Sequence, residues 1–186
     1  MSELLSKDDC KANGYLSLLG HRYSCRKFGA TQLTDEELGV VLEAARKSPS
    51  ACNNQPIRLC VVQSEEGLAK IDECTKCRYG APTVIIAAYE YGESSHPTST
   101  HGPETCDFGD IDTSIALTNM ENAAASLGLG TCWVGAFDAS AVRERFNVPE
   151  SCKLVELLMI GHALAAPGPR HAERKAVEEF TTYESF

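Results

Sequence analysis

The sequence contains no apolar run long enough to cross a membrane as a helix, and it has no excess of basic residues. Lysine and arginine number 17 against 26 aspartates and glutamates, which gives a formal net charge of -9. An acidic chain is a poor partner for the phosphate backbone of nucleic acids and is repelled by anionic membranes. The first nine residues also lack the apolar core of a signal peptide. We therefore expect a cytoplasmic protein that binds neither nucleic acid nor membrane.

Two common enzyme signatures are also missing. The glycines never form the Gly-x-Gly-x-x-Gly fingerprint that holds a dinucleotide on a Rossmann unit. No Ser-His-Asp arrangement can be identified in the sequence. Neither a tightly bound nicotinamide nor a serine nucleophile is expected.

Cysteine is the exception in a sequence of otherwise ordinary composition. Nine cysteines are scattered through the chain, an odd number that favours free thiols in a reducing compartment. Cys74 and Cys77 form a Cys-x-x-Cys pair. The pair lacks the second half of a zinc site and the surroundings of a thioredoxin motif, so two structural thiols are expected.

One polar loop offers groups that bind metals. Residues 92–109 are rich in Ser, Thr, Pro and His. The candidate ligands are His96, His101, Glu104, Cys106 and Asp107. Their spacing fits no established metal motif, so a metal-binding module is kept only as a weaker alternative.

The hydrophobic patterns predict alternating helices and strands in one domain. Helices are expected at residues 9–19, 35–47, 64–74, 110–127 and 138–146, and strands at 58–63, 83–91, 131–137 and 155–161. The sequence of residues 34–37, TDEE, predicts a capping box between Thr34 and Glu37 at the start of the second helix. Residues 59–62 are apolar throughout, which predicts a strand buried on both faces. The long central helix does not suit a doubly wound sheet, so the class is α+β. Residues 1–186 form the domain, with a C-terminal arm at 163–186.

Two N-terminal segments carry the strongest functional signal. Residues 22–28 have the sequence RYSCRKF. In an extended chain Arg22, Ser24 and Arg26 project from one side, which offers two guanidinium groups and a hydroxyl to a phosphate. Residues 48–56 have the sequence SPSACNNQP, whose small and amide side chains let the backbone approach a flat ligand.

The C-terminal arm has too few apolar groups for a core of its own. Pro167 and Pro169 are expected to keep it out of helix. Beyond Pro169 its large apolar residues are Val177, Phe180, Tyr183 and Phe186. Exposed in water they form a patch that monomers usually avoid, so the arm is expected to pack on something else.

Together these segments resemble the nitroreductase family of flavin mononucleotide (FMN) enzymes. That family shows an Arg-x-Ser-x-Arg/Lys-x-Phe motif, then a helix and a Pro-Ser-x-x-Asn-x-Gln-Pro loop, and both are present here in that order. Residues 128–137, GLGTCWVGAF, and 169–179, PRHAERKAVEE, resemble two further family blocks. The chain departs from the family at Ile57, where an aromatic residue is frequent, and at Ala172, where a lysine is frequent.

The resemblance implies a fold and a cofactor site. The fold would be nitroreductase-like, a mixed sheet flanked by helices in an intertwined homodimer whose arm reaches across the interface. Arg22 and Ser24 would hold the phosphate and ribityl end of FMN, and Arg26 would lie near the N1–O2 edge of its ring. The remaining implied FMN residues are Tyr23, Pro49, Ser50, Ala51, Asn53, Gln55, Trp133, Val134, Gly135, Ala136 and Arg174. The loop at residues 49–55 would come from the partner subunit.

The implied activity is that of an FMN-dependent oxidoreductase. NADH or NADPH would give hydride to the flavin, and a small acceptor such as a nitroaromatic or a quinone would take it in a ping-pong cycle. No side chain is expected to act as a covalent catalyst, and no metal is implied. The alternative from another class is a flavin-binding redox sensor or carrier without turnover.

Overall fold

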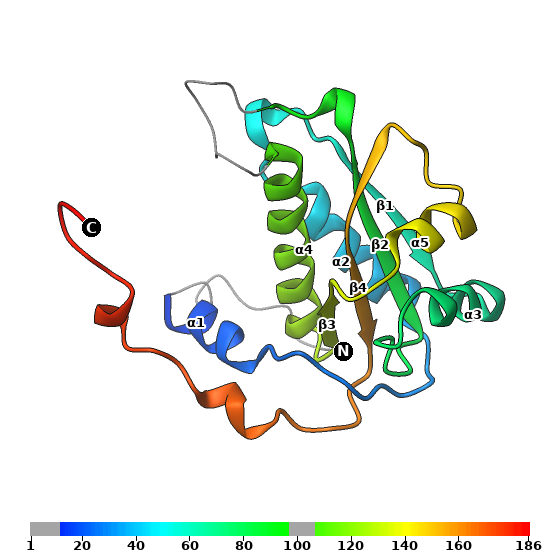
Figure 1. The fold of residues 1–186 in the computed structure, drawn as a ribbon. Helices are drawn as coiled ribbons and strands as arrows, with labels where there is room; N and C mark the ends of the chain where they lie inside the picture. Colours follow the sequence, from blue (N-terminus) through cyan, green and yellow to red (C-terminus); the bar gives the residue numbers. More distant parts are fainter. Residues whose placement is uncertain (1–11, 97–106) are drawn as a thin grey trace.

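The computed structural model of the chain describes residues 12–96 and 107–186. Figure 1 shows the elements in order. The helices are α1 (Ala12–His21), α2 (Asp35–Arg46), α3 (Glu65–Cys74), α4 (Phe108–Ser126) and α5 (Ala139–Arg145). The strands are β1 (Ile57–Val62), β2 (Thr83–Glu90), β3 (Gly130–Val134) and β4 (Cys152–Gly161). Helices and a separate antiparallel sheet make this an α+β fold, as predicted.

The sheet has the strand order β1-β2-β4-β3, and every neighbouring pair is antiparallel. The prediction of a mixed sheet is therefore wrong for these four strands. The reason is that α3 returns the chain to the end at which β1 finished, where Val62 pairs with Val84, so β2 runs back along β1. Parallel pairing among the described residues is limited to an isolated bridge between Ser24 and Thr131.

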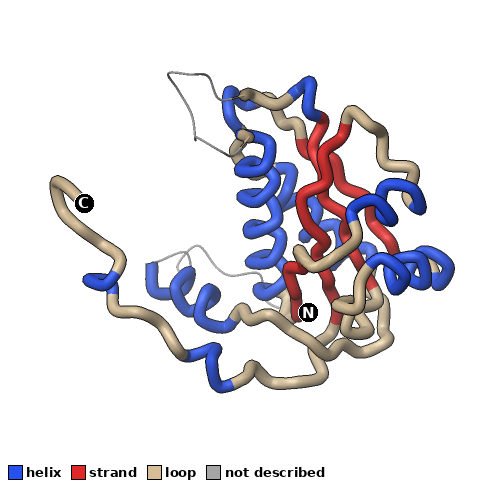
Figure 2. Tube along the Cα trace, viewed as in Figure 1, coloured by secondary structure: helices blue, strands red, loops and turns tan. Residues whose placement is uncertain are grey.

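Helices cover both faces of the sheet (Figures 1 and 2). On one face α2 and α4 enclose a core that includes Val41, Leu117 and Leu158. On the other, α3 and α5 pack through Ile71 and Val142. Burial of each of these side chains stabilises the folded state by about 1.5–3 kcal/mol. The sheet therefore forms a stable support for residues at its edges.

Two helices start at capping boxes, of which the sequence analysis predicted one and missed the other. The capping box predicted at Thr34 is present, since its hydroxyl accepts a bond from the Glu37 N–H at 3.2 Å and the Glu37 carboxylate accepts the Thr34 N–H at 2.8 Å. A second box at Asp107 and Asp110 was not predicted, and it starts α4 two residues early. The strand β4 starts at Cys152, three residues before the prediction, which began too late because Lys153 interrupts the apolar pattern near the strand's start.

The strand β1 differs from its prediction. Its residues alternate between half-buried and exposed, and only Val62 is fully buried. The prediction of burial on both faces is wrong because β1 lies at the edge of the sheet in this chain. An apolar run alone does not distinguish a central from an edge strand.

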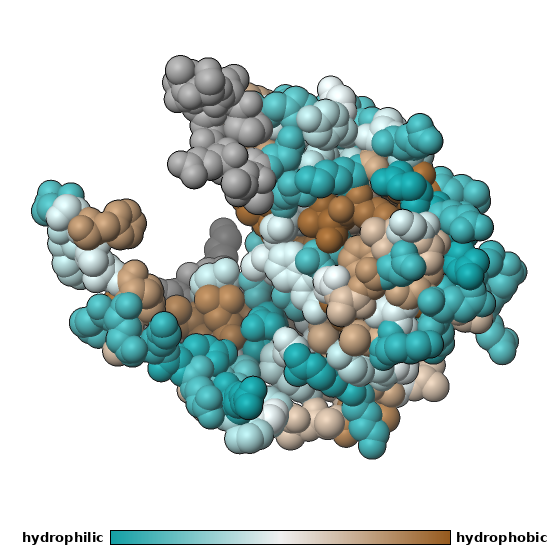
Figure 3. Space-filling model, in the orientation of Figure 1, coloured by the Kyte–Doolittle hydropathy of each residue, from teal (hydrophilic) through white to brown (hydrophobic). Residues whose placement is uncertain are grey.

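The C-terminal arm follows β4, and its end extends away from the body (Figures 1 and 3). It forms no α-helix, as predicted from its prolines, and contains two short 3-10 turns, Pro169–Ala172 and Val177–Glu179. Val177, Phe180, Tyr183 and Phe186 are all exposed. Among the described residues, no helix is long and apolar enough to span a membrane.

Candidate cofactor site

A cationic pocket of about 410 Å³ lies between residues 22–26 and the start of the arm. The side chains that matter chemically are those of Arg22, Ser24, Arg26, Arg170, His171 and Arg174. None of the described residues that line it carries a carboxylate. Four guanidinium groups around one space have the charge and geometry that suit a strongly anionic group such as a phosphate.

Backbone pairing places the first of these side chains. The Cys25 N–H donates to the Thr131 carbonyl at 2.7 Å, beside the bridge between Ser24 and Thr131. Cys25 is buried, and alternation turns its neighbours Ser24 and Arg26 to the other side, where they line the pocket together with Arg22. The extended conformation predicted from the spacing is confirmed.

The arm supplies the opposite wall. The His171 ring nitrogen Nε2 lies 2.7 Å from the Gly20 carbonyl, and the Tyr23 hydroxyl donates to the Ala165 carbonyl. The Tyr23 and His171 rings meet edge to face with centroids 6.0 Å apart. These contacts bring Arg170 and Arg174 to Arg22, from which they are separated by most of the sequence. Arg170 lies in the pocket near the position where relatives carry a lysine.

A buried carboxylate lies behind Arg22. Glu121 of α4 is 5% exposed, and its Oε1 lies 3.8 Å from the Arg22 Nη1. The same oxygen accepts a bond of 2.9 Å from the Thr131 hydroxyl. Burial raises the pKa of Glu121, while the bond from Thr131 and the charge of Arg22 oppose that rise. The prediction did not include Glu121, although a glutamate among the small residues of a buried helix is a visible signal.

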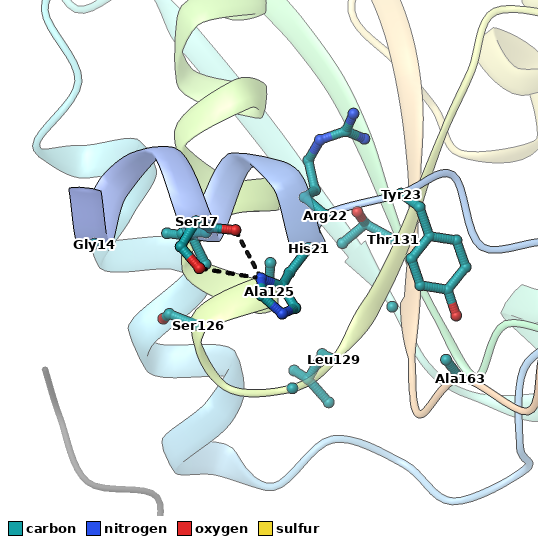
Figure 4. A pocket seen from close by; sticks show the side chains of 13 residues that line it. Gly14, Ser17, His21, Arg22, Tyr23, Ala125, Ser126, Leu129, Thr131 and Ala163 are labelled. Atoms are coloured by element: carbon teal, nitrogen blue, oxygen red, sulfur yellow. Dashed lines mark hydrogen bonds between the residues drawn. The ribbon is translucent and has the colours of Figure 1, made fainter. Parts of the chain in front are cut away.

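A second pocket of about 420 Å³ adjoins the first, and Arg22 and Tyr23 line both (Figure 4). It lies among α1, the end of α4 and the start of β3. The His21 Nδ1 is 2.7 Å from the Ser17 carbonyl, which holds the ring against its own helix. The sequence analysis did not predict this pocket.

The predicted loop at residues 49–55 lies elsewhere in the chain. Pro49, Ser50 and Gln55 line a separate pocket of about 180 Å³, in which none of the cationic-pocket residues takes part. Asn53, which is exposed, and Ala51 line neither of these two pockets. One chain therefore does not bring this loop to Arg22.

The loop has an unusual backbone. Cys52, Asn53 and Gln55 have φ angles of 54°, 56° and 53°, in the left-handed region that L-residues rarely adopt. The Ser50 hydroxyl accepts a bond of 2.9 Å from the Gln55 N–H. Such conformations persist only where the surroundings enforce them, and they cluster at functional sites.

The third predicted block follows β3. Trp133 and Val134 end the strand, and Gly135 and Ala136 are exposed beyond it. The prediction of a strand through residue 137 is therefore wrong, since pairing with β4 ends at Val134. Trp133 lines a further pocket of about 440 Å³ beside α4, whereas Val134 is buried in the core.

Gly135 lies against a carboxylate. A Cβ at this position would come within 2.9 Å of the Glu156 Oε2, so any other residue here would have to displace that carboxylate. That oxygen is buried without a hydrogen-bond partner among the described residues. Burial raises the pKa of Glu156.

Replacing Glu156 by glutamine is expected to stabilise the protein at pH 8 but not at pH 4. The folded-state pKa lies above the unfolded one, so the folded state binds more protons and stability falls as pH rises past the unfolded value. Removing the charge eliminates that loss, by on the order of 1 kcal/mol. Thermal unfolding of both proteins across this pH range measures the effect, with exposed Glu150→Gln as the control. An equal change in melting temperature at both pH values would contradict it.

The structure describes both cysteines of the Cys-x-x-Cys pair but not all of the candidate metal ligands. Cys74 is buried and donates to the Lys70 carbonyl at 3.2 Å, and Cys77 is half-buried. The ring Nδ1 of His96 pairs with Asp107 at 2.6 Å. The other three loop candidates, His101, Glu104 and Cys106, lie outside the described residues. Within residues 12–96 and 107–186, no group of ligands is arranged to hold a metal ion.

Comparison with known proteins places the chain. Residues 19–79 and 76–162 match the Nitroreductase family. The FMN reductase (NAD(P)H) of Bacillus subtilis strain 168 is 31% identical over an alignment of 193 positions, gaps included. The alignment covers 90% of this chain and 73% of that protein. A nitroreductase family protein from Clostridium difficile 630 superposes with a TM-score of 0.84 at 31% identity, covering 92% and 98% of the two chains.

A third similarity concerns the fold alone. A Desulfovibrio desulfuricans protein described as a nitroreductase, in complex with FMN, matches with a TM-score of 0.78 at 22% identity, covering 95% and 99% of the two chains. The family match extends over most of the sequence and includes the first three of the four motifs identified in the sequence. The chain belongs to the nitroreductase family.

Proposed function

We propose that this protein is an FMN-dependent oxidoreductase that takes hydride from NADH or NADPH and passes it to a small acceptor such as a nitroaromatic or a quinone. The observation that carries the proposal is the cationic pocket, in which two segments far apart in sequence bring four arginines together. The similarity to an FMN reductase supports the choice of cofactor.

The donors of the cationic pocket fit FMN. A dianionic phosphate suits Arg22 and Arg174, whose guanidinium groups donate paired hydrogen bonds, and the Ser24 hydroxyl suits the ribityl chain. Arg26 lies on the same side of the segment and would stabilise negative charge at the N1–O2 edge of the ring. FMN, when bound, supplies hydride transfer at its N5 atom. The side chains of this protein bind, orient and supply charge, and none is a covalent catalyst.

We propose further that two subunits complete the site. The loop at residues 49–55 and the cationic pocket line different cavities of one chain. A homodimer in which the loop of one subunit faces the pocket of the other unites the two sets of predicted residues. The exposed apolar groups of the arm are available to hold such a dimer together. Donor and acceptor would use one slot in turn, which gives ping-pong kinetics.

The proposal is tested on the purified full-length protein. We expect a yellow preparation whose released flavin is FMN, and steady oxidation of NADH or NADPH when a nitroaromatic or a quinone is added. Parallel double-reciprocal plots would support the ping-pong scheme. A protein that binds FMN without turnover with either nucleotide would instead be a flavin carrier or sensor. A protein without affinity for FMN would contradict the proposal.

A further inference from the structure

Asp112 connects the central helix to the left-handed loop. It lies in the second turn of α4 and is 5% exposed. Its Oδ1 accepts a hydrogen bond of 2.9 Å from the Ala51 N–H, and its Oδ2 is buried without a partner among the described residues. Arg46 lines the same pocket but pairs with Glu43 at 2.6 Å. A carboxylate kept in this position without a paired cation needs a reason, because its burial is unfavourable.

The loop has few means of holding its shape by itself. Three of its residues occupy the left-handed region, which for a residue other than glycine costs roughly 1–3 kcal/mol. Its internal bonds join Ser50 to Asn53 and Gln55, Ala51 to Asn54, and Asn53 to Gln55, and so do not fix the loop relative to the body.

Side-chain bonds to the body do fix it. Asn54 donates to the Ser95 hydroxyl at 3.1 Å, and two further bonds come from α4. Asn119 donates to the Ser48 hydroxyl at 2.8 Å at the start of the loop. Asp112 accepts the Ala51 N–H, which lies three residues further along the loop. The bond to Asp112 lies next to the strained residues. It therefore opposes the relaxation of the backbone that strain would otherwise cause.

We infer that Asp112 is a positioning residue, which holds the loop at residues 50–55 in the conformation that faces the flavin of the partner subunit. The inference rests on the proposed function for the flavin and the dimer, and on the observed hydrogen bond for the loop. Asp112 acts through Ala51 and does not itself touch the cofactor.

The first experiment measures the loop without cofactor. Hydrogen exchange of the full-length FMN-free protein is followed by mass spectrometry for wild type, Asp112→Ala, Asp112→Asn and the surface control Asp72→Ala. In Asp112→Ala the peptides covering residues 50–56 should exchange at least tenfold faster, while the β2 peptides stay protected. Asp112→Asn should restore protection to within about twofold of wild type, because its amide oxygen accepts the same bond. Equal loop exchange in wild type and Asp112→Ala would overturn the inference.

The second experiment removes the donor instead of the acceptor. Ser50 has φ -138° and ψ 156°, the extended conformation that precedes proline, and Ala51 begins a 3-10 turn. Ala51→Pro therefore removes the N–H with little change of backbone, and this variant is informative even if Asp112→Ala folds poorly. Each single variant should weaken FMN binding about tenfold. The double variant should be no weaker than either, since both remove one bond. Additive losses would contradict the shared bond.

The two experiments separate this inference from the function on which it rests. Wild-type protein without affinity for FMN would reject the flavin role of the loop, whereas hydrogen exchange would still decide whether Asp112 holds it. Normal FMN affinity in Asp112→Ala, together with a faster-exchanging loop, would reject positioning for the cofactor.

Discussion

Replacing Arg22 by alanine should raise the dissociation constant for FMN about ten- to a hundredfold. Arg22 lines the cationic pocket and suits a charge-assisted bond to phosphate, the loss of which is worth roughly 1.5–3 kcal/mol. Arg22 also has a buried neighbour in Glu121, so its loss leaves that carboxylate with less positive charge nearby. Fluorescence titration of FMN into the cofactor-free protein measures the change.

Three further variants make this result specific. Arg145→Ala removes an exposed arginine paired with Glu73 on the surface and should leave FMN affinity unchanged. Arg26→Ala should weaken binding less and make the flavin potential more negative, because its charge acts near the reduced ring. The double variant Arg22→Ala/Glu121→Gln removes the uncompensated charge, so it should recover stability without recovering affinity. Unchanged FMN affinity in Arg22→Ala would remove Arg22 from the site.

Truncation of the arm should separate dimer formation from cofactor contacts. A chain ending at residue 175 keeps Arg170 and Arg174 in the pocket but loses Val177, Phe180, Tyr183 and Phe186, all of them exposed. We expect this chain to dimerise at least tenfold more weakly, since each buried apolar side chain contributes about 1.5–3 kcal/mol. A chain ending at residue 168 also loses the arginines and should bind FMN weakly at any concentration.

Protein concentration distinguishes the two truncations. Raising it should restore dimer and FMN binding together in the 175-residue chain, by mass action, but should not restore binding in the 168-residue chain. Sedimentation velocity and flavin fluorescence on the same samples provide both readings. If the 168-residue chain remains a dimer and binds FMN tightly, the arm has neither role.

The sequence predicted the elements that local chemistry determines. Thr34 with Glu37 marked the start of α2, and the alternation of Arg22, Ser24 and Arg26 indicated the extended segment that the structure contains. The approach of the arm to Arg22 came from the family resemblance, since no local pattern links residues so far apart.

What the sequence could not predict depends on tertiary contacts. The edge position of β1 is a matter of strand order, and its apolar run looks the same in either place. The left-handed backbone at Cys52 and Gln55 is imposed by surrounding contacts, because neither residue type favours it. The position of Glu121 behind Arg22 requires α4 to pack beside β3, which spacing within either segment does not reveal.

The pairing of Cys25 with Thr131 also bears on how the protein avoids aggregation. β3 is the last strand of its sheet, and an uncovered edge offers unpaired backbone groups to neighbouring molecules. Residues 24 and 25 cover part of that edge, with Phe28 pairing nearby to Ala163. The backbone that presents arginines to the cationic pocket thus also hinders strands of other molecules from pairing with β3. Separation of this segment from β3 would expose the edge of the sheet. We therefore expect ligands to enter the pocket from the side of the arm.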